Sequence, residues 1–113
     1  VLSTIHTRNA LSCIDRLENL GVDRYAITNT LLFISSQRLI KRIDLNSIGG
    51  RIAIHEVLEF TNDLCAGIQH NLPLSEIKKI AQLEGFTSMY ENAKDLVQKG
   101  IINDSSIIQE IFI

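Results

Sequence analysis

Residues 50–60 read Gly-Arg-Ile-Ala-Ile-His-Glu-Val-Leu-Glu-Phe, and this stretch indicates a fold that contains β-structure. Apolar side chains recur at even-numbered positions, which is the pattern of a strand with one buried face. They are Ile52, Ile54, Leu58 and Phe60. Glu56 falls on the same apolar face, and a carboxylate that is buried alone is costly, so it needs a partner.

The segment before this strand predicts a turn and a second extended region. Residues 46–50 end in two glycines, which can take positive φ, so a turn is expected there. Residues 37–43 fit either the continuation of a helix or a strand. Periodicity alone does not decide between the two, and we favour the strand.

Helical periodicity and capping residues account for most of the remaining chain. Helices are expected to begin at or just after residues 9, 23, 61, 75, 88 and 104. The second is expected to run to Ile34, and Ser88 with Glu91 forms a capping box for the fifth. Val1–Ile5 is interpreted as the end of a buried strand. The sequence therefore predicts an α/β portion, residues 1–70, followed by a helical region, residues 71–113.

Composition narrows the class of protein. The chain has 113 residues, 45% of them hydrophobic and 21% charged, with a net charge of −2. This balance fits one globular domain and gives no argument for nucleic acid or an anionic membrane surface as partner. The only cysteines, Cys13 and Cys65, form no C-x-x-C pair, so neither a disulfide framework nor zinc is expected. No apolar run approaches the roughly 18 residues that span a bilayer, and we expect a soluble intracellular domain.

A polar cluster lies in residues 3–7, Ser-Thr-Ile-His-Thr, directly before the first expected helix. There His6 can donate a hydrogen bond to a phosphate oxygen or position a water, and Thr4 and Thr7 can assist. Alternatively, His6 caps the helix or bonds loop carbonyls. The 113 residues contain no G-x-x-x-x-G-K-[ST] loop, so this chain alone is expected to be catalytically inactive. We therefore expect the chain to begin within a larger nucleotide-driven protein.

Charged residues near the expected strands have two interpretations. Glu56 either forms an internal ion pair, with Arg51, Arg38 or Arg16 as the available cation, or takes part in a nucleotide site. Lys41 and Arg42 lie close to Arg38 in a basic cluster. The cluster fits a solvated strand edge or a subunit interface better than nucleic acid, because no aromatic residues are interleaved for base stacking.

Taken in order, these fragments resemble one family, the hexameric ATPases of type II secretion and type IV pilus assembly. Val1–Thr7 is similar to that family's histidine box, and residues 37–39, Gln-Arg-Leu, resemble a step further along. Residues 50–58 resemble its Gly-Arg-x-x-x-x-Glu-hydrophobic-hydrophobic motif. Residues 80–86 and 99–101 resemble its closing helical region.

The resemblance implies a partial RecA-like ATPase domain with a small C-terminal helical region. Residues 1–70 would be the second half of that domain, including the histidine box and a strand pair, and residues 71–113 a helical subdomain. His6 would sense or orient the γ-phosphate, with Thr4 and Thr7 supporting its loop. Arg51 and Glu56 would border the nucleotide pocket or stabilise it.

The resemblance also implies cofactors and partners. ATP and Mg would bind the full-length parent, whose sister subunits would form a homo-hexameric ring beside an inner-membrane platform protein. The expected location is cytoplasmic, peripheral to the bacterial inner membrane. Many relatives insert a zinc-binding four-cysteine loop between Ile43 and Gly49, which this chain lacks, and carry Asn where this chain has Arg8. The alternative is a non-enzymatic remnant that binds a partner through its helical tail.

Overall fold

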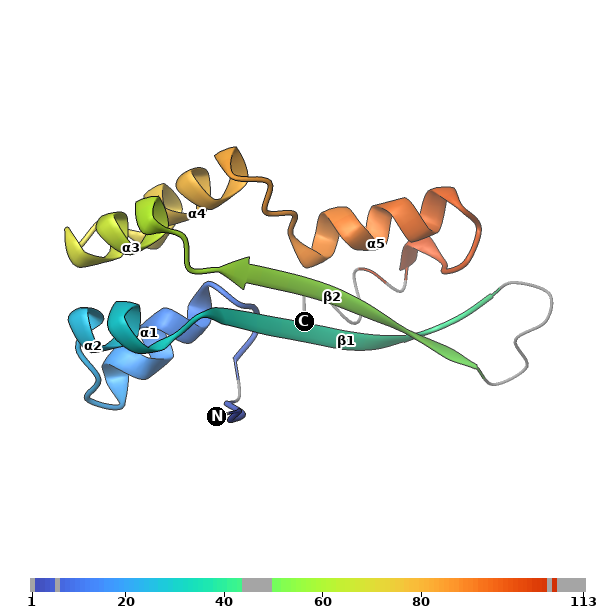
Figure 1. Ribbon diagram of the computed structural model, residues 1–113. Helices are drawn as coiled ribbons and strands as arrows, with labels where there is room; N and C mark the ends of the chain where they lie inside the picture. Colours follow the sequence, from blue (N-terminus) through green and yellow to red (C-terminus); the bar gives the residue numbers. More distant parts are fainter. Residues whose placement is uncertain (1, 6, 44–49, 106, 108–113) are drawn as a thin grey trace. The chain divides into compact units, whose positions relative to one another are not determined.

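The computed structural model describes residues 2–5, 7–43, 50–105 and 107 (Figure 1). These residues form five helices and a hairpin of two strands, which confirms the α/β class. The elements are α1 (Ser12–Asn19), α2 (Arg24–Thr30), β1 (Phe33–Lys41), β2 (Arg51–Glu59), α3 (Asn62–Gln69), α4 (Leu74–Leu83) and α5 (Met89–Gln98). Unit 1 comprises residues 1–35 and 57–86, and unit 2 comprises residues 36–56 and 87–113.

The hairpin keeps one register from end to end. The Arg42 N–H donates to the Gly50 carbonyl at 3.1 Å, and the Phe60 N–H donates to the Leu32 carbonyl at 2.9 Å. Both bonds belong to the same antiparallel pairing, so no extra residue is inserted in either strand. This register places Lys41 opposite Arg51 on the exposed face. The even-numbered residues of β2 point to the other face, as the alternation predicted.

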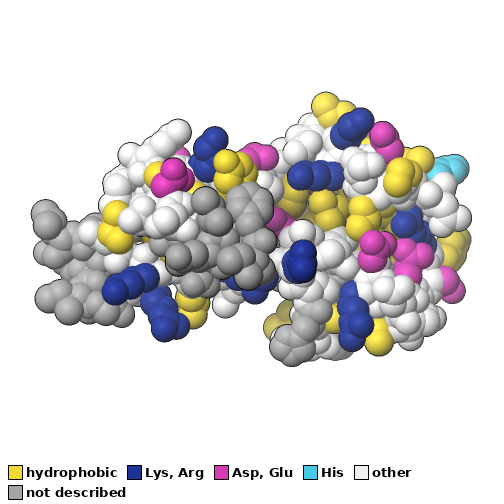
Figure 2. Space-filling model, turned by 180° about the vertical axis from the view of Figure 1, so that it is seen from behind, with side chains coloured by type: hydrophobic (Ala, Val, Ile, Leu, Met, Phe, Trp, Pro, Cys, Tyr) yellow, Lys and Arg dark blue, Asp and Glu magenta, His cyan; other side chains and the backbone are white. Residues whose placement is uncertain are grey.

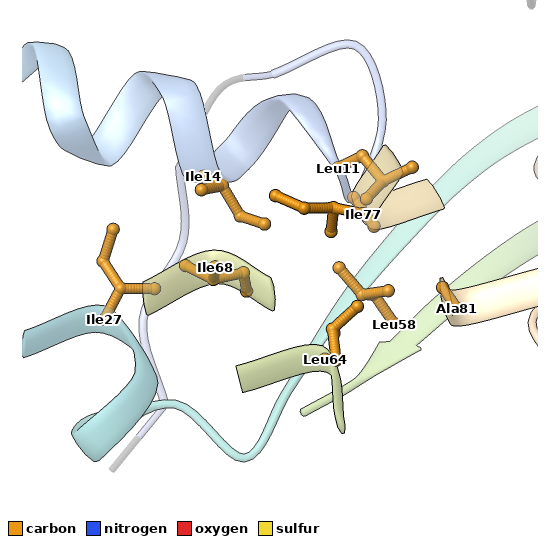
Figure 3. Close-up of a cluster of buried hydrophobic side chains, with 9 residues drawn as sticks. Leu11, Ile14, Ile27, Leu58, Leu64, Ile68, Ile77 and Ala81 are labelled. Atoms are coloured by element: carbon orange, nitrogen blue, oxygen red, sulfur yellow. The ribbon is translucent and has the colours of Figure 1, made fainter. Parts of the chain in front are cut away.

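Unit 1 is built from four helices, the start of β1 and the end of β2. Each helix buries apolar side chains towards the same centre, where Leu58 of β2 also lies (Figure 3). The buried cluster consists of Ala10, Leu11, Ile14, Ile27, Leu58, Leu64, Ile68, Ile77 and Ala81. Burial of a full aliphatic side chain contributes about 1.5–3 kcal/mol, so this cluster accounts for much of the stability of the unit.

Side chains define where most of the helices begin. Asn9 Oδ1 accepts from the Ser12 N–H at 2.8 Å before α1, and Asp23 Oδ1 accepts from the Ala26 N–H at 2.8 Å before α2. Thr61 caps α3 in the same way, at 3.3 Å from the Leu64 N–H. Each cap satisfies a backbone donor that has no partner within the helix. The start positions predicted near residues 23 and 61 are therefore confirmed, whereas α1 begins at Ser12, three residues after Asn9.

Unit 2 packs α5 against the even-numbered face of the strands. Its buried cluster consists of Ile40, Ile54, Met89, Ala93, Ile102 and Ile107. Ser88 accepts from the Glu91 N–H at 3.2 Å, so α5 begins where the capping-box pattern predicted. The Ile43 N–H donates to the Ile101 carbonyl at 2.8 Å, which joins the end of β1 to the segment after α5.

Two predicted elements are wrong, and a third is confirmed in part. Leu2–Ile5 form no strand, and Leu2 is 93% exposed, because a strand needs a neighbour to pair with and the described residues supply none. The helix expected to reach Ile34 ends at Thr30, since Leu31 is extended and Ile34 lies in β1. The extended alternative for residues 37–43 is confirmed as far as Lys41, where β1 ends.

Two further boundaries differ slightly from the prediction. Helix α4 starts at Leu74 after Pro73 rather than at Ser75. At the last helical turn Asn103, not Asp104, supplies the cap, because its Oδ1 accepts from the Ser105 N–H at 3.2 Å. The turn expected at residues 46–49 and the final helix beyond residue 107 lie outside the described residues. The boundaries of units 1 and 2 differ from the expected boundary at residue 70. The expected division into a RecA-like part, residues 1–70, and a helical subdomain, residues 71–113, stays a prediction.

Candidate functional site

The N-terminal segment before α1 carries three of the predicted site residues. Thr4 is exposed, whereas Thr7 is half-buried and its hydroxyl donates to the Asn9 carbonyl at 3.0 Å. This bond ties the segment to the capping turn of α1. His6 lies outside the residues that the structure describes. Thr7 is therefore bonded to the turn before α1, and the role predicted for it beside His6 stays a prediction.

Arg51 and Glu56 lie on opposite faces of β2. Arg51 opens the strand and is exposed, whereas Glu56 is 4% exposed. Because side chains alternate along a strand, residues five positions apart point in opposite directions. The structure therefore does not bring these two predicted site residues together. Thr4 and Thr7 belong to unit 1, and Arg51 and Glu56 to unit 2.

The Glu56 carboxylate lies at the N-terminus of α5. Its Oε2 accepts from the Met89 N–H at 2.8 Å, and Met89 is the first residue of the helix. The N-terminus of a helix carries a partial positive charge, which stabilises a carboxylate placed there. One residue before Glu56, the His55 carbonyl accepts from Asn92 Nδ2 at 2.6 Å. Strand β2 is thus joined to the first turn of α5 by two polar contacts.

Sequence analysis did not identify the Met89 N–H as a partner of Glu56, because every residue except proline has a backbone N–H and the residue type does not reveal which one is used. A usable signal was present, since Ser88 and Glu91 mark the start of a helix and hence the position of its free amides. The contacts described for Glu56 are those of a residue that stabilises the fold. The part predicted for Glu56 at a nucleotide pocket stays a prediction, and we derive no chemical step from it.

Unit 1 contains a hollow of about 260 Å³ between the end of β2 and the end of α4. Its polar lining is acidic: Glu59 and Glu84 are exposed, and Glu84 Oε1 accepts from the Thr61 hydroxyl at 2.7 Å. Ala81 and Phe86 supply apolar walls. The volume is below the roughly 300–1,000 Å³ of small-molecule pockets, and the two carboxylates repel phosphate. The hollow is therefore unsuited to a nucleotide.

Arg24 is a second residue that sequence analysis did not single out. Its Nε donates to Glu18 Oε1 at 2.9 Å, and its Nη1 donates to the carbonyls of Leu72 at 2.8 Å and Ile68 at 3.3 Å. The side chain is 13% exposed. These bonds join α1 and α2 to the C-terminal end of α3, where a cation complements the negative end of the helix. Arg24 is a packing residue of unit 1.

The two cysteines have the properties of core residues. Cys13 is buried in α1 and Cys65 is half-buried in α3. Burial raises the pKa of both thiols, which keeps them protonated and weakly nucleophilic near neutral pH. Across the described ranges no three His, Cys, Asp or Glu side chains are grouped so as to hold a metal ion. Within the same ranges, no helix has the length and apolar character needed to cross a membrane.

Comparison with known proteins assigns the chain to a family. Residues 1–112 match the family described as type II/IV secretion system protein. The chain belongs to this family. A protein transport protein HofB homolog of Haemophilus influenzae is 33% identical over 95 residues, which cover 73% of this chain and 20% of the relative.

Two further relatives match most of this chain but only a small part of their own length. The type II secretion system protein E of Xanthomonas campestris is 26% identical over 139 residues, covering 88% of this chain and 24% of the relative. The type IV pilus assembly ATPase PilB of Thermus thermophilus is 26% identical over 140 residues, covering 89% of this chain and 16% of the relative. This chain thus spans about a fifth of the length of the relatives it matches. Both alignments exceed 113 residues, so these relatives carry additional residues within the aligned region.

Solved structures of the same fold include the ATPase DotB of Yersinia pseudotuberculosis, with a TM-score of 0.72 and 22% identity. The match covers 94% of this chain and 29% of that chain. DotB of Legionella pneumophila matches with a TM-score of 0.70 and 21% identity, over 89% of this chain. The described α/β arrangement is therefore a fold that these two structures share.

Proposed function

We propose that this chain is the C-terminal part of an ATP-hydrolysing motor that drives type II secretion or the assembly or retraction of type IV pili. The observation that carries the proposal is the family match over residues 1–112, supported by relatives whose names are those of secretion and pilus proteins. The fold shared with DotB is consistent with it. In this proposal residues 1–70 belong to a RecA-like domain and residues 71–113 to a helical subdomain.

The catalytic contribution of this chain is proposed for the segment before α1. His6 would orient the γ-phosphate, and Thr4 and Thr7 would hold its loop. Phosphoryl transfer depends on positioned charge, so a histidine in this role modulates turnover without forming a covalent intermediate. Thr7 supports this assignment, because its bond to the Asn9 carbonyl fixes the loop to a capped helix.

Arg51 and Glu56 would act more indirectly. Glu56 would stabilise the strand pair through the α5 amide, and the exposed Arg51 would remain available at the border of the pocket or at a subunit contact. ATP and Mg would bind the parent protein, in which the phosphate loop precedes this chain. The motor would be a hexamer in the cytoplasm that contacts a platform protein of the inner membrane.

The test uses the full-length gene product. His6→Ala is expected to lower magnesium-dependent ATP turnover by roughly 100-fold, because misplacement of a group that orients the reacting phosphate has an effect of this size. His55→Ala and His70→Ala are matched controls, since both histidines are exposed. Turnover unchanged by His6→Ala, or lowered equally by all three substitutions, would remove the proposed role of His6.

The isolated 113-residue chain is expected to hydrolyse no ATP, because it contains no G-x-x-x-x-G-K-[ST] loop. The measurement is phosphate release with magnesium across chromatographic fractions of the purified chain. Turnover that follows the protein peak would contradict this prediction. Normal secretion or pilus function in cells whose full-length protein lacks ATPase activity would favour the partner-binding alternative instead.

A further inference from the structure

Two like charges lie directly opposite each other near the end of the hairpin. The register pairs Lys41 with Arg51, and both side chains are exposed on the odd-numbered face. Like charges in directly opposite positions destabilise a strand pair. The position therefore carries a small energetic cost in the isolated chain that an anionic partner would offset.

The surroundings of this pair add apolar surface. Leu39 and Ile43 are 52% and 54% exposed. We call these four residues of the odd-numbered face, Leu39, Lys41, Ile43 and Arg51, the basic tip. Figure 2 shows Lys and Arg side chains gathered at this end of the hairpin.

Acidic residues are scarce along the strands that carry the basic tip. Within residues 36–43 and 50–56 the one acidic side chain is Glu56, which is buried on the other face. Asp44 lies outside the described residues. Over the described positions, Lys41 and Arg51 therefore have no acidic neighbour on the exposed face of this part of the hairpin.

The hollow of unit 1 has the complementary character. Glu59 and Glu84 are its charged residues, and no basic side chain is among the described residues that line it. The lining also includes apolar surface, because Val57 is 51% exposed. A space of about 260 Å³ with an acidic lining suits the cationic end of one Lys or Arg side chain.

We infer that the basic tip of one copy of this chain docks into the acidic hollow of a second copy. The inference rests on the proposed function in one respect, namely that the motor works as an assembly of copies. Because the two surfaces are different, the contact is head-to-tail, and repetition of such a contact gives a ring if the rotation closes. Charge complementarity favours a second copy over nucleic acid, since the tip has no interleaved aromatic side chains for stacking.

Charge reversal tests the contact without any need for ATP hydrolysis. Lys41→Glu with Arg51→Glu gives a chain whose tip and hollow are both acidic. Glu59→Lys with Glu84→Lys gives a chain in which both are basic. Sedimentation velocity of the wild-type chain is expected to show self-association that weakens as salt is added. Each double variant alone is expected to associate at least about tenfold more weakly, because like charges then face each other.

An equimolar mixture of the two variants is the decisive sample. The acidic tip of one variant then meets the basic hollow of the other, and the reverse pair also matches, so association at the wild-type level is expected. Lys78→Glu with Lys94→Glu is the matched control, since it changes net charge equally on exposed helix positions and is expected to leave self-association unchanged. Circular dichroism establishes that each variant is folded before association is compared.

Three results would overturn the inference: a wild-type chain that stays monomeric, a mixture that associates no better than its components, or a control variant that loses association equally. Binding of the tip to phosphatidylglycerol vesicles without self-association would likewise overturn it and assign the tip to a lipid surface. The proposed motor function is tested by a separate measurement, ATP hydrolysis by the full-length protein. If association is restored in the mixture but the full-length protein hydrolyses no ATP, the contact stands and the ATPase proposal fails. If the full-length protein hydrolyses ATP but the mixture does not associate, the ATPase proposal stands and the contact fails.

Discussion

Unit 1 and unit 2 each place one largely buried charge at the end of a helix, but the two charges have opposite sign. In unit 1 the Arg24 guanidinium lies at the C-terminal end of α3 and reaches two carbonyls and Glu18. In unit 2 the Glu56 carboxylate lies at the N-terminal end of α5 and accepts from the Met89 N–H. Each charge meets the helix end whose dipole complements it.

The difference between the two residues lies in how fully they are withdrawn from water. The Arg24 side chain is 13% exposed, whereas Glu56 is 4% exposed. Loss of Arg24 still leaves the Ile68 carbonyl with a donor, because the Asn71 N–H also bonds to it at 3.1 Å. Loss of Glu56 leaves a buried amide donor, and a buried donor without an acceptor costs its full desolvation free energy. Removal of the two side chains should therefore have unequal effects.

The largest effect is expected for Glu56→Ala. The substitution should lower the free energy of unfolding by about 2–4 kcal/mol, because it removes a charged hydrogen bond inside unit 2. Glu56→Gln keeps an acceptor oxygen for the Met89 N–H and should lower it less. Urea denaturation followed by circular dichroism measures both. An unfolding midpoint equal to that of the wild type would show that the carboxylate contributes nothing to stability.

Arg24→Met should follow, with a loss of about 2 kcal/mol. Methionine keeps the apolar stem that packs between the helices but removes three donated hydrogen bonds. Lys78→Met is the control, since Lys78 is exposed on α4. If the two substitutions had the same effect in urea denaturation, Arg24 would be an ordinary surface charge and the comparison between the units would fail.

A smaller effect is expected for Gly67→Ala in α3. A Cβ at this position would lie 2.7 Å from Ile80 Cδ1, so α3 and α4 must shift or Ile80 must change rotamer, at a cost of about 1–2 kcal/mol. Ile80→Val removes that atom. The cost of Gly67→Ala should therefore be smaller in the Ile80→Val background, as a double-mutant cycle measures. Equal costs in both backgrounds would contradict the close approach.

The smallest effects are expected for the exposed ion pairs that each unit carries on a helix. Lys79 lies 3.3 Å from Glu76 on α4, and Lys99 lies 2.9 Å from Asp95 on α5. All four side chains are at least half exposed. Substitution of either lysine by glutamine should change the free energy of unfolding by about 0.5 kcal/mol or less, and salt should reduce the difference further. A larger change in one unit would show that its surface is coupled to its core.

The parts of the fold that were predictable from sequence are those that depend on neighbouring residues. Asp23, Thr61 and Ser88 cap helices because a side chain reaches a backbone donor three residues away. The burial alternation of β2 was equally local. The remaining elements depend on whether a segment finds a neighbouring strand to pair with. Leu2–Ile5 form no strand, and β1 begins at Phe33, where a helix had been expected.

The candidate site was less predictable for the same reason. Glu56 was correctly identified as a buried charge, but the Met89 N–H was not among the partners considered, and the predicted arginine partner stays a prediction. The acceptors of Arg24 are mainly carbonyls 44 and 48 positions away along the chain, which no local pattern reveals. The proposed roles of His6, Thr4, Thr7 and Arg51 depend on a nucleotide and stay predictions.

The hydrogen bond that closes the hairpin also makes it a tolerant place to lengthen the chain. The Arg42 N–H holds the Gly50 carbonyl, and the neighbouring Ile43 N–H holds Ile101, so both ends of any inserted sequence are anchored. Doubling the length of a flexible loop costs only about 0.6 kcal/mol of closure entropy. Evolution or an engineer can therefore graft a whole additional module between these anchors while the strand register below them is kept.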